Sequence, residues 1–145
     1  MQFDNINWEN TTEFIYPITS GYVIKVYDGD TITIASKMPY ENSPLFRFSV
    51  RLNGIDTPEI KSKNESEKIL AKKARDSLSQ LIMTKHVTLQ NVKNEKYGRI
   101  LADVYLDELH INTWMIDQSF AVAYDGKTKQ IPASWSEFYE SKIAK

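Results

Sequence analysis

The chain has 145 residues, a formal net charge of −1 and no cysteine. A chain of this length can bury a hydrophobic core without cross-links, so we expect one domain over residues 1–145. The absence of cysteine excludes disulfides, thiolate zinc sites and thiol nucleophiles. The near-zero charge excludes a strongly basic coat of the kind that binds nucleic acid over a whole surface, but it allows a local basic groove.

The N-terminal part of the sequence carries little regular pattern. Residues 1–12 predict an irregular arm, and Phe14–Tyr16 predicts a short strand before Pro17. No stretch is long and apolar enough to cross a membrane. The first residues also lack the basic and apolar regions of a signal peptide. We therefore expect a soluble, cytoplasmic protein, a monomer with no obligate protein partner.

Alternating apolar residues predict three strands in the first half of the chain. These strands are Tyr22–Tyr27, Thr31–Ile34 and Phe46 to about Ile55. Asp28-Gly29-Asp30 separates the first two strands, and Asp-Gly is typical of a hairpin. In the third strand Arg51 falls on the face opposite the apolar row. Gly54 and Pro58 are expected to end that strand in a turn.

A helix and two more strands follow. Asn64 and Glu67 form a candidate capping box, and apolar residues at helical spacing continue to Leu81. The remaining predicted elements are the strands Val87–Val92 and Ile100–Leu106, the polar hairpin Lys93–Arg99 between them, and short helices at Ile111–Gln118 and Ala133–Lys142. This order predicts an α+β fold that is mainly β, a five-stranded OB-fold barrel with a helix after the third strand and short C-terminal helices.

Each polar motif has an ordinary structural explanation when it is taken alone. Asp28-Gly29-Asp30-Thr31 is typical of a hairpin turn, and Asp56-Thr57-Pro58-Glu59 of a turn that ends a strand. Arg51 is explained as a solvated strand residue, and Lys96-Tyr97-Gly98-Arg99 as a charged hairpin tip. Together the motifs have a chemical logic, although spacing along the chain does not show that they meet.

Taken together, the residues of these motifs are suited to the hydrolysis of a phosphodiester. Asp30 and Asp56 are hard oxygen donors suited to Ca²⁺, and the carbonyl of Thr57 could add a third ligand. Glu59 could orient or deprotonate a water molecule. Arginine forks such as those of Arg51 and Arg99 clamp phosphate oxygens and stabilise the charge that develops on them.

The chain resembles the staphylococcal nuclease-like family, also called thermonuclease or micrococcal nuclease. The resemblance spans about Gly21 to Tyr124 and rests on three motifs in the right order. The motifs are Val26-Tyr27-Asp28-Gly29-Asp30-Thr31, Arg51-Leu52 through Asp56-Thr57-Pro58-Glu59, and Lys96-Tyr97-Gly98-Arg99. The resemblance implies an OB-fold barrel that cleaves DNA and RNA with Ca²⁺ and leaves 3′-phosphates.

The resemblance also assigns roles to individual positions. Asp30, Asp56 and Thr57 match the calcium ligands, and Glu59 matches the general base. Arg51 and Arg99 match the two catalytic arginines. The residues that match positions near the nucleotide are Lys96, Tyr97 and, by a looser alignment, Tyr124.

Two departures and two alternatives remain. Gly126 stands where the best-known members carry a second pocket tyrosine, and the tail after Tyr124 is shorter, which leaves base preference open.

One alternative function is a catalytically inactive OB-type module that binds nucleic acid or protein. Such modules typically lose the acids and arginines, and this chain keeps all of them. A structural barrel without a ligand would leave the gathered acids unexplained, and their repulsion should raise at least one pKa.

Overall fold

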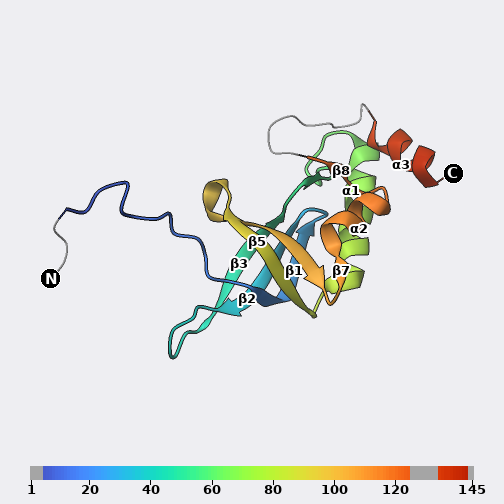
Figure 1. The fold of residues 1–145 in the computed structure, drawn as a ribbon. Coiled ribbons are helices and arrows are strands. Elements are labelled where there is room, and N and C mark those ends of the chain that lie inside the picture. Colours follow the sequence, from blue (N-terminus) through green and yellow to red (C-terminus); the bar gives the residue numbers. More distant parts are fainter. Residues whose placement is uncertain (1–4, 125–133, 144–145) are drawn as a thin grey trace.

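The structure, a computed structural model, describes residues 5–124 and 134–143. Five strands form a closed barrel (Figure 1). They are β1 (Ser20–Asp28), β2 (Thr31–Lys37), β3 (Leu45–Leu52), β5 (His86–Asn94) and β6 (Ile100–Leu106). The hydrogen-bonded order is β3-β2-β1-β5-β6, and a further pairing between β3 and β6 closes the ring. The predicted OB-fold barrel is confirmed.

The closing pair is parallel, whereas the other pairs within the barrel are antiparallel. Val50, Arg51 and Leu52 of β3 lie opposite Ile100, Leu101 and Ala102 of β6. Val50, Leu52, Ile100 and Ala102 are fully or almost fully buried, which places them in the barrel core. The alternation of β3 therefore turns Arg51 away from the core at the end of the barrel where the strand finishes.

Three helices pack on the barrel (Figure 1). They are α1 (Glu65–Ile82), α2 (Ile111–Asp117) and α3 (Trp135–Ile143). The aromatic residues of α3 pack against the core, and Trp135 is only 4% exposed. No helix in the described part of the chain is long and apolar enough to cross a membrane.

The start of α1 follows the predicted cap in part. The side chain of Asn64 accepts a hydrogen bond from the backbone N–H of Glu67 at 3.0 Å, as an N-cap does. The reciprocal half of a capping box is not formed. The Glu67 carboxylate instead accepts from the backbone N–H of Glu59 at 3.4 Å, so the first turn of the helix contacts the loop that carries Glu59.

One predicted strand is wrong, and another is wrong at its end. Phe14–Tyr16 forms no strand, because the rings pack on neighbouring aromatic side chains and the carbonyl of Phe14 accepts from the side chain of Asn94. The third strand does not run on to Ile55. Gly54, at φ 81°, turns the chain, and β4 (Ile55–Asp56) pairs with β8 (Val122–Ala123). Positive φ is a conformation that glycine adopts at little cost.

Asn112 of α2 fixes this turn from inside the protein. Its side chain donates to the carbonyl of Asn53 at 2.7 Å and accepts from the N–H of Val104 at 2.9 Å. The N–H of Asn53 also donates to the carbonyl of Ala102 at 2.9 Å. Asn112 is only 2% exposed, so water does not replace these bonds easily.

We expect Asn112→Ala to lower the free energy of unfolding by about 2–4 kcal/mol, because it leaves buried backbone groups without partners. Thr113→Ala, which removes an exposed hydrogen bond between α2 and His110, the residue that precedes this helix, is the control and should cost less than about 1 kcal/mol. Denaturant unfolding measures both values. Equal effects of the two substitutions would show that Asn112 does not fix the turn.

Candidate active site

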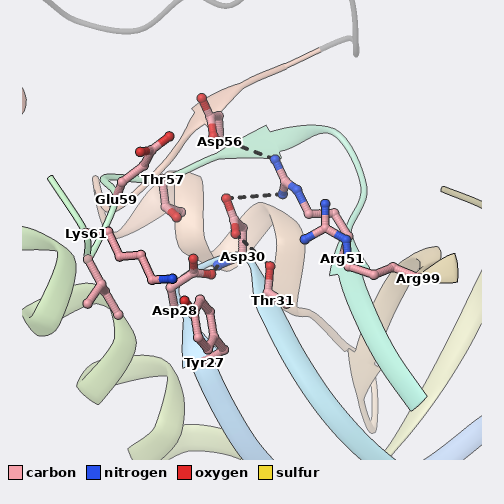
Figure 2. Close-up of a pocket in the computed structure, with 11 residues that line it drawn as sticks. Tyr27, Asp28, Asp30, Thr31, Arg51, Asp56, Thr57, Glu59, Lys61 and Arg99 are labelled. Carbon is pink, nitrogen blue, oxygen red and sulfur yellow. Dashed lines mark hydrogen bonds and ion pairs between the residues drawn. The ribbon is translucent and has the colours of Figure 1, made fainter. Parts of the chain in front are cut away.

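The sequence-predicted catalytic and metal residues line one cavity of about 280 Å³ at the end of the barrel (Figure 2). The segments that form it are the β1–β2 turn, the end of β3, the loop after β4 and the start of β6. Its lining residues are Tyr27, Asp28, Asp30, Thr31, Arg51, Asp56, Thr57, Glu59, Ile60, Lys61 and Arg99. The fold thus brings together residues that are far apart in the sequence.

A close approach between two loops sets the position of Asp30. A Cβ atom on Gly29 would lie 3.1 Å from Cγ2 of Thr57 and 3.2 Å from Cε of Met115, so the turn depends on the missing side chain. The carbonyl of Asp30 accepts from the N–H of Leu52 at 2.8 Å. These contacts fix the β1–β2 turn against both β3 and the loop after β4.

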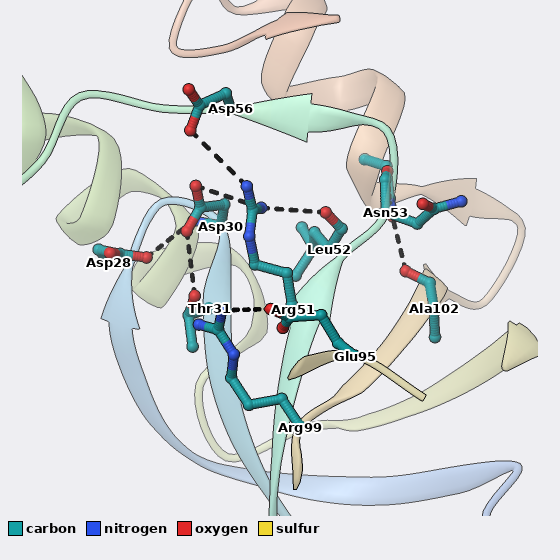
Figure 3. A network of polar contacts seen from close by, with 11 residues as sticks. Asp28, Asp30, Thr31, Arg51, Leu52, Asn53, Asp56, Glu95, Arg99 and Ala102 are labelled. Atoms are coloured by element: carbon teal, nitrogen blue, oxygen red, sulfur yellow. Dashed lines mark hydrogen bonds and ion pairs between the residues drawn. The ribbon is translucent and has the colours of Figure 1, made fainter. Parts of the chain in front are cut away.

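Arg51 lies between the two acids that were expected to bind metal (Figure 3). Its Nη1 is 3.2 Å from Oδ2 of Asp30, and its Nη2 is 3.6 Å from Oδ1 of Asp56. Nη1 also donates to the carbonyl of Leu52 at 3.2 Å. The two carboxylates are almost fully buried, which strengthens their interaction with the guanidinium and makes each charge costly if it is left unpaired.

A third acid adds negative charge to the same corner. Oδ1 of Asp28 accepts from the backbone N–H of Asp30 at 3.1 Å. The pKa of Asp28 is raised from 3.8 to about 7, first by burial of the carboxyl and then by the neighbouring carboxylate of Asp30, while the backbone N–H of Asp30 and the cation of Arg51 act in the opposite direction. The expectation that gathered acids raise at least one pKa is confirmed here.

Arg99 reaches the cavity from the hairpin between β5 and β6. Its Nη2 donates to Oε1 of Glu95 at 2.6 Å, and the N–H of Glu95 donates back to the carbonyl of Arg99 at 2.9 Å. Nε of Arg99 is buried and has no hydrogen-bond partner among the described residues. The guanidinium is therefore held at one end and retains a donor for another acceptor.

Glu59 and Lys61 lie on the loop that joins β4 to α1. Both residues are exposed and line the cavity. Figure 2 shows the side chain of Lys61 directed toward Asp28. Sequence reasoning missed Lys61, because a lysine in a charged loop carries no motif. Its position two residues after Glu59 is the signal that could have found it.

The residues expected near the nucleotide separate into two groups. Lys96 and Tyr124 line a second cavity of about 430 Å³, which shares Arg51 with the first. The N–H of Tyr124 donates to the carbonyl of Gly54 at 2.8 Å, so the turn after β3 positions it. Tyr97, with φ 67°, lies on the short helical turn η1 (Lys96–Gly98), is 94% exposed and lines neither cavity. Gly126 lies outside the described residues.

Comparison with known proteins identifies the family. The family described as staphylococcal nuclease homologue matches residues 49–142. The chain belongs to the staphylococcal nuclease family. The resemblance inferred from the three motifs is confirmed.

Named relatives agree with this family. An uncharacterized endonuclease of Haemophilus influenzae is 35% identical over 102 residues, 70% of this chain and 51% of that protein. An uncharacterized protein of Bacillus anthracis is 34% identical over 131 residues, 86% of this chain and 58% of that protein. A thermonuclease of Staphylococcus hyicus is 33% identical over 103 residues, 70% of this chain and 57% of that protein. The chain thus spans a little over half the length of these relatives.

The family implies a calcium ion, and the donors at the cavity fit an open site. Within residues 5–124 and 134–143, no group of three or more His, Cys, Asp or Glu side chains is placed to hold a metal ion by itself. Asp30 and Asp56 offer buried carboxylates, and Thr57 is only 3% exposed at the same cavity. The buried Oγ1 of Thr57 has no partner in the described part of the protein. A hard cation that keeps several water ligands suits this donor set.

We expect Asp28→Asn to raise the free energy of unfolding of the metal-free protein at pH 8 by roughly 1–2 kcal/mol. The wild-type folded state binds more protons at Asp28 than the unfolded chain does between pH 3.8 and about 7. The free energy of unfolding of the wild type therefore decreases as pH rises through this window. The Asp28→Asn variant should not show this decrease, because it has no carboxyl group at this position.

Urea unfolding in the presence of a chelator, at pH 5 and pH 8, measures the difference. Asp76→Asn is the matched control, because Asp76 is an exposed acid paired with Arg75. A stability difference between Asp28→Asn and wild type that is the same at both pH values would contradict the prediction.

Proposed function

We propose that the chain is a calcium-dependent nuclease that hydrolyses phosphodiester bonds of DNA, RNA or both. One observation carries the proposal. A single cavity gathers buried carboxylates, an exposed carboxylate and two arginines from four separate segments of the chain. The family and the nuclease names of its relatives support the same reaction class.

In this proposal Asp30, Asp56 and the carbonyl of Thr57 hold the calcium ion. When bound, the ion supplies positive charge at the phosphate oxygens and orients the substrate. Arg51 and Arg99 each present a planar fork, which suits a phosphate that gains charge as its phosphorus becomes five-coordinate. The free Nε of Arg99 is one donor for that purpose.

Glu59 acts on the attacking water. Its carboxylate takes a proton as the water oxygen forms a bond to phosphorus, and the bond from phosphorus to the 5′ oxygen breaks. The 5′ oxygen leaves with the bonding electrons and takes up a proton, so the product carries a 3′-phosphate. An exposed carboxylate suits this role, because it can exchange its proton with solvent between turnovers.

We expect Glu59→Gln to lower kcat by about 10²–10⁴-fold and to leave oligonucleotide binding nearly unchanged, because only proton transfer is lost. The assay is cleavage of single-stranded DNA and of RNA with added Ca²⁺ and with a chelator. Glu65→Gln, an exposed glutamate at the start of α1, is the control.

The outcomes separate the candidate functions. A near-normal rate for Glu59→Gln would remove this residue from the role of base. If the wild-type chain cuts neither polymer but binds a labelled oligonucleotide, the protein is an inactive binding module. Cleavage that persists with the chelator would overturn the calcium requirement.

Lys61 is expected to contact a substrate phosphate, because its cation lies at the same cavity. Lys61→Gln should raise KM several-fold and leave kcat within about twofold. It should also make the plot of log binding constant against log salt concentration less steep by about 0.7, which is the contribution of one phosphate contact to a single strand. Lys63→Gln is the control, since Lys63 is exposed and does not line the cavity. Equal effects of the two substitutions would leave Lys61 without a specific role.

A further inference from the structure

Four aromatic side chains form a continuous row at the side of the barrel, here called the aromatic row. Phe14 contacts Tyr16 at 5.5 Å between ring centroids, Tyr16 contacts Phe48 at 5.8 Å, and Phe48 contacts Phe46 at 6.2 Å. Phe14 is 62% exposed and Phe46 38% exposed, whereas the two central rings are half-buried. The row therefore has a packed base and exposed rings at both ends.

The aromatic row joins two distant parts of the chain. Phe14 and Tyr16 belong to the segment before β1, and Phe46 and Phe48 belong to β3. In Figure 1 this segment leaves the barrel beside β3 and β5 and extends away from it. β1 begins at Ser20, and the catalytic cavity is lined by no residue of the segment before it. A contiguous set of exposed apolar side chains, unlike a single exposed one, is a candidate binding surface.

Asn94 connects the aromatic row to the second cavity. Its side chain lines that cavity and donates to the carbonyl of Phe14 at 2.6 Å. The second cavity shares Arg51 with the catalytic cavity. A path over the surface thus runs from the catalytic cavity, through the second cavity, to Phe14 and along the row to Phe46.

Exposed cations lie beside the end of this path at the second cavity. They are Lys93 and Lys96, which line that cavity. The acid nearest Phe14, Glu13, accepts a hydrogen bond from the amide of Asn94 at 3.1 Å. Rings for bases and cations for phosphates are the two elements of a single-strand binding surface.

We propose that the aromatic row binds unpaired bases of the nucleic-acid strand that occupies the catalytic cavity. This inference rests on the proposed function for its substrate class. Bases of any identity stack on aromatic rings, so the row adds affinity without sequence preference. Its contribution depends on strand length, because a fragment that fills only the catalytic cavity does not reach Phe14.

The test compares single-stranded DNA of about three nucleotides with single-stranded DNA of about twelve nucleotides, of which only the longer falls within the roughly 4–16 nucleotides that an OB fold binds. The double variant Phe14→Leu/Phe46→Leu retains apolar packing but removes the rings that face solvent. Phe14→Trp/Phe46→Trp restores larger rings. Fluorescence anisotropy of labelled strands, with a chelator to prevent cleavage, gives the dissociation constants.

The leucine pair should bind the longer strand about tenfold more weakly and the shorter strand as the wild type does. The tryptophan pair should bind the longer strand at least as tightly as the wild type. Ile69→Ala, an exposed apolar residue on α1, is the control and should change neither affinity. Thermal unfolding checks that the leucine pair remains folded.

Three results would overturn the inference. The leucine pair could bind the longer strand normally, lose affinity equally for both lengths, or convert a dimer to a monomer in sedimentation without any length-dependent effect. The last result would identify the aromatic row as a contact between copies of the chain. Cleavage of the shorter strand with Ca²⁺ tests the nuclease proposal separately, so the failure of one proposal is distinguishable from the failure of the other.

Discussion

The parallel pairing of β3 with β6 is the constraint on which the site depends. It sets Arg51 opposite Leu101, two residues after Arg99, and so brings both arginines to the same end of the barrel. The pairing joins segments about fifty residues apart, and the entropic cost of such a long closure must be met by burial. Val50, Leu52, Ile100 and Ala102 supply that burial. The same interaction that closes the barrel therefore assembles the candidate active-site cavity.

Within this frame, the site concentrates more negative charge than the fold itself requires. Asp30 and Asp56 both lie at one guanidinium, and the raised pKa of Asp28 shows that a further carboxylate is costly there. A barrel selected for stability alone would replace buried acids with apolar residues. The proposed calcium ion would add positive charge at this corner, and its binding would stabilise the folded state.

Local sequence signals predicted much of the fold, since they act over a few residues. Alternation located the main strands, and helical spacing with Asn64 located α1. The predictions that were wrong concern segments whose partners lie far away in the sequence. The break at Gly54 follows from the pairing of β4 with β8, and β8 lies more than sixty residues away. Phe14–Tyr16 has the composition of a strand, but its rings pack on β3 and its backbone forms no ladder.

For the site, the motifs identified which residue types could act on a phosphodiester. Only the family resemblance indicated that these residues lie close together in the fold, because their spacing along the chain does not show it. Six of the nine expected residues line the catalytic cavity, and Lys96 and Tyr124 line the second. Tyr97 falls outside both cavities, because η1 places it at an exposed tip with positive φ. Lys61 was missed because its role depends only on where the loop after β4 directs it.

The net charge of −1 bears on how the chain could gain affinity for a nucleic-acid strand, and so on the proposed role of the aromatic row. A strongly basic nuclease gains most of its affinity by releasing counterions from phosphates, and this gain grows with every cation on its surface. Here the cations near the cavities are few, and Arg51 and Arg99 are already engaged by acids. Stacking of bases on aromatic rings needs no cation on the protein. In the proposed single-strand complex, the aromatic row would supply this kind of affinity next to the second cavity.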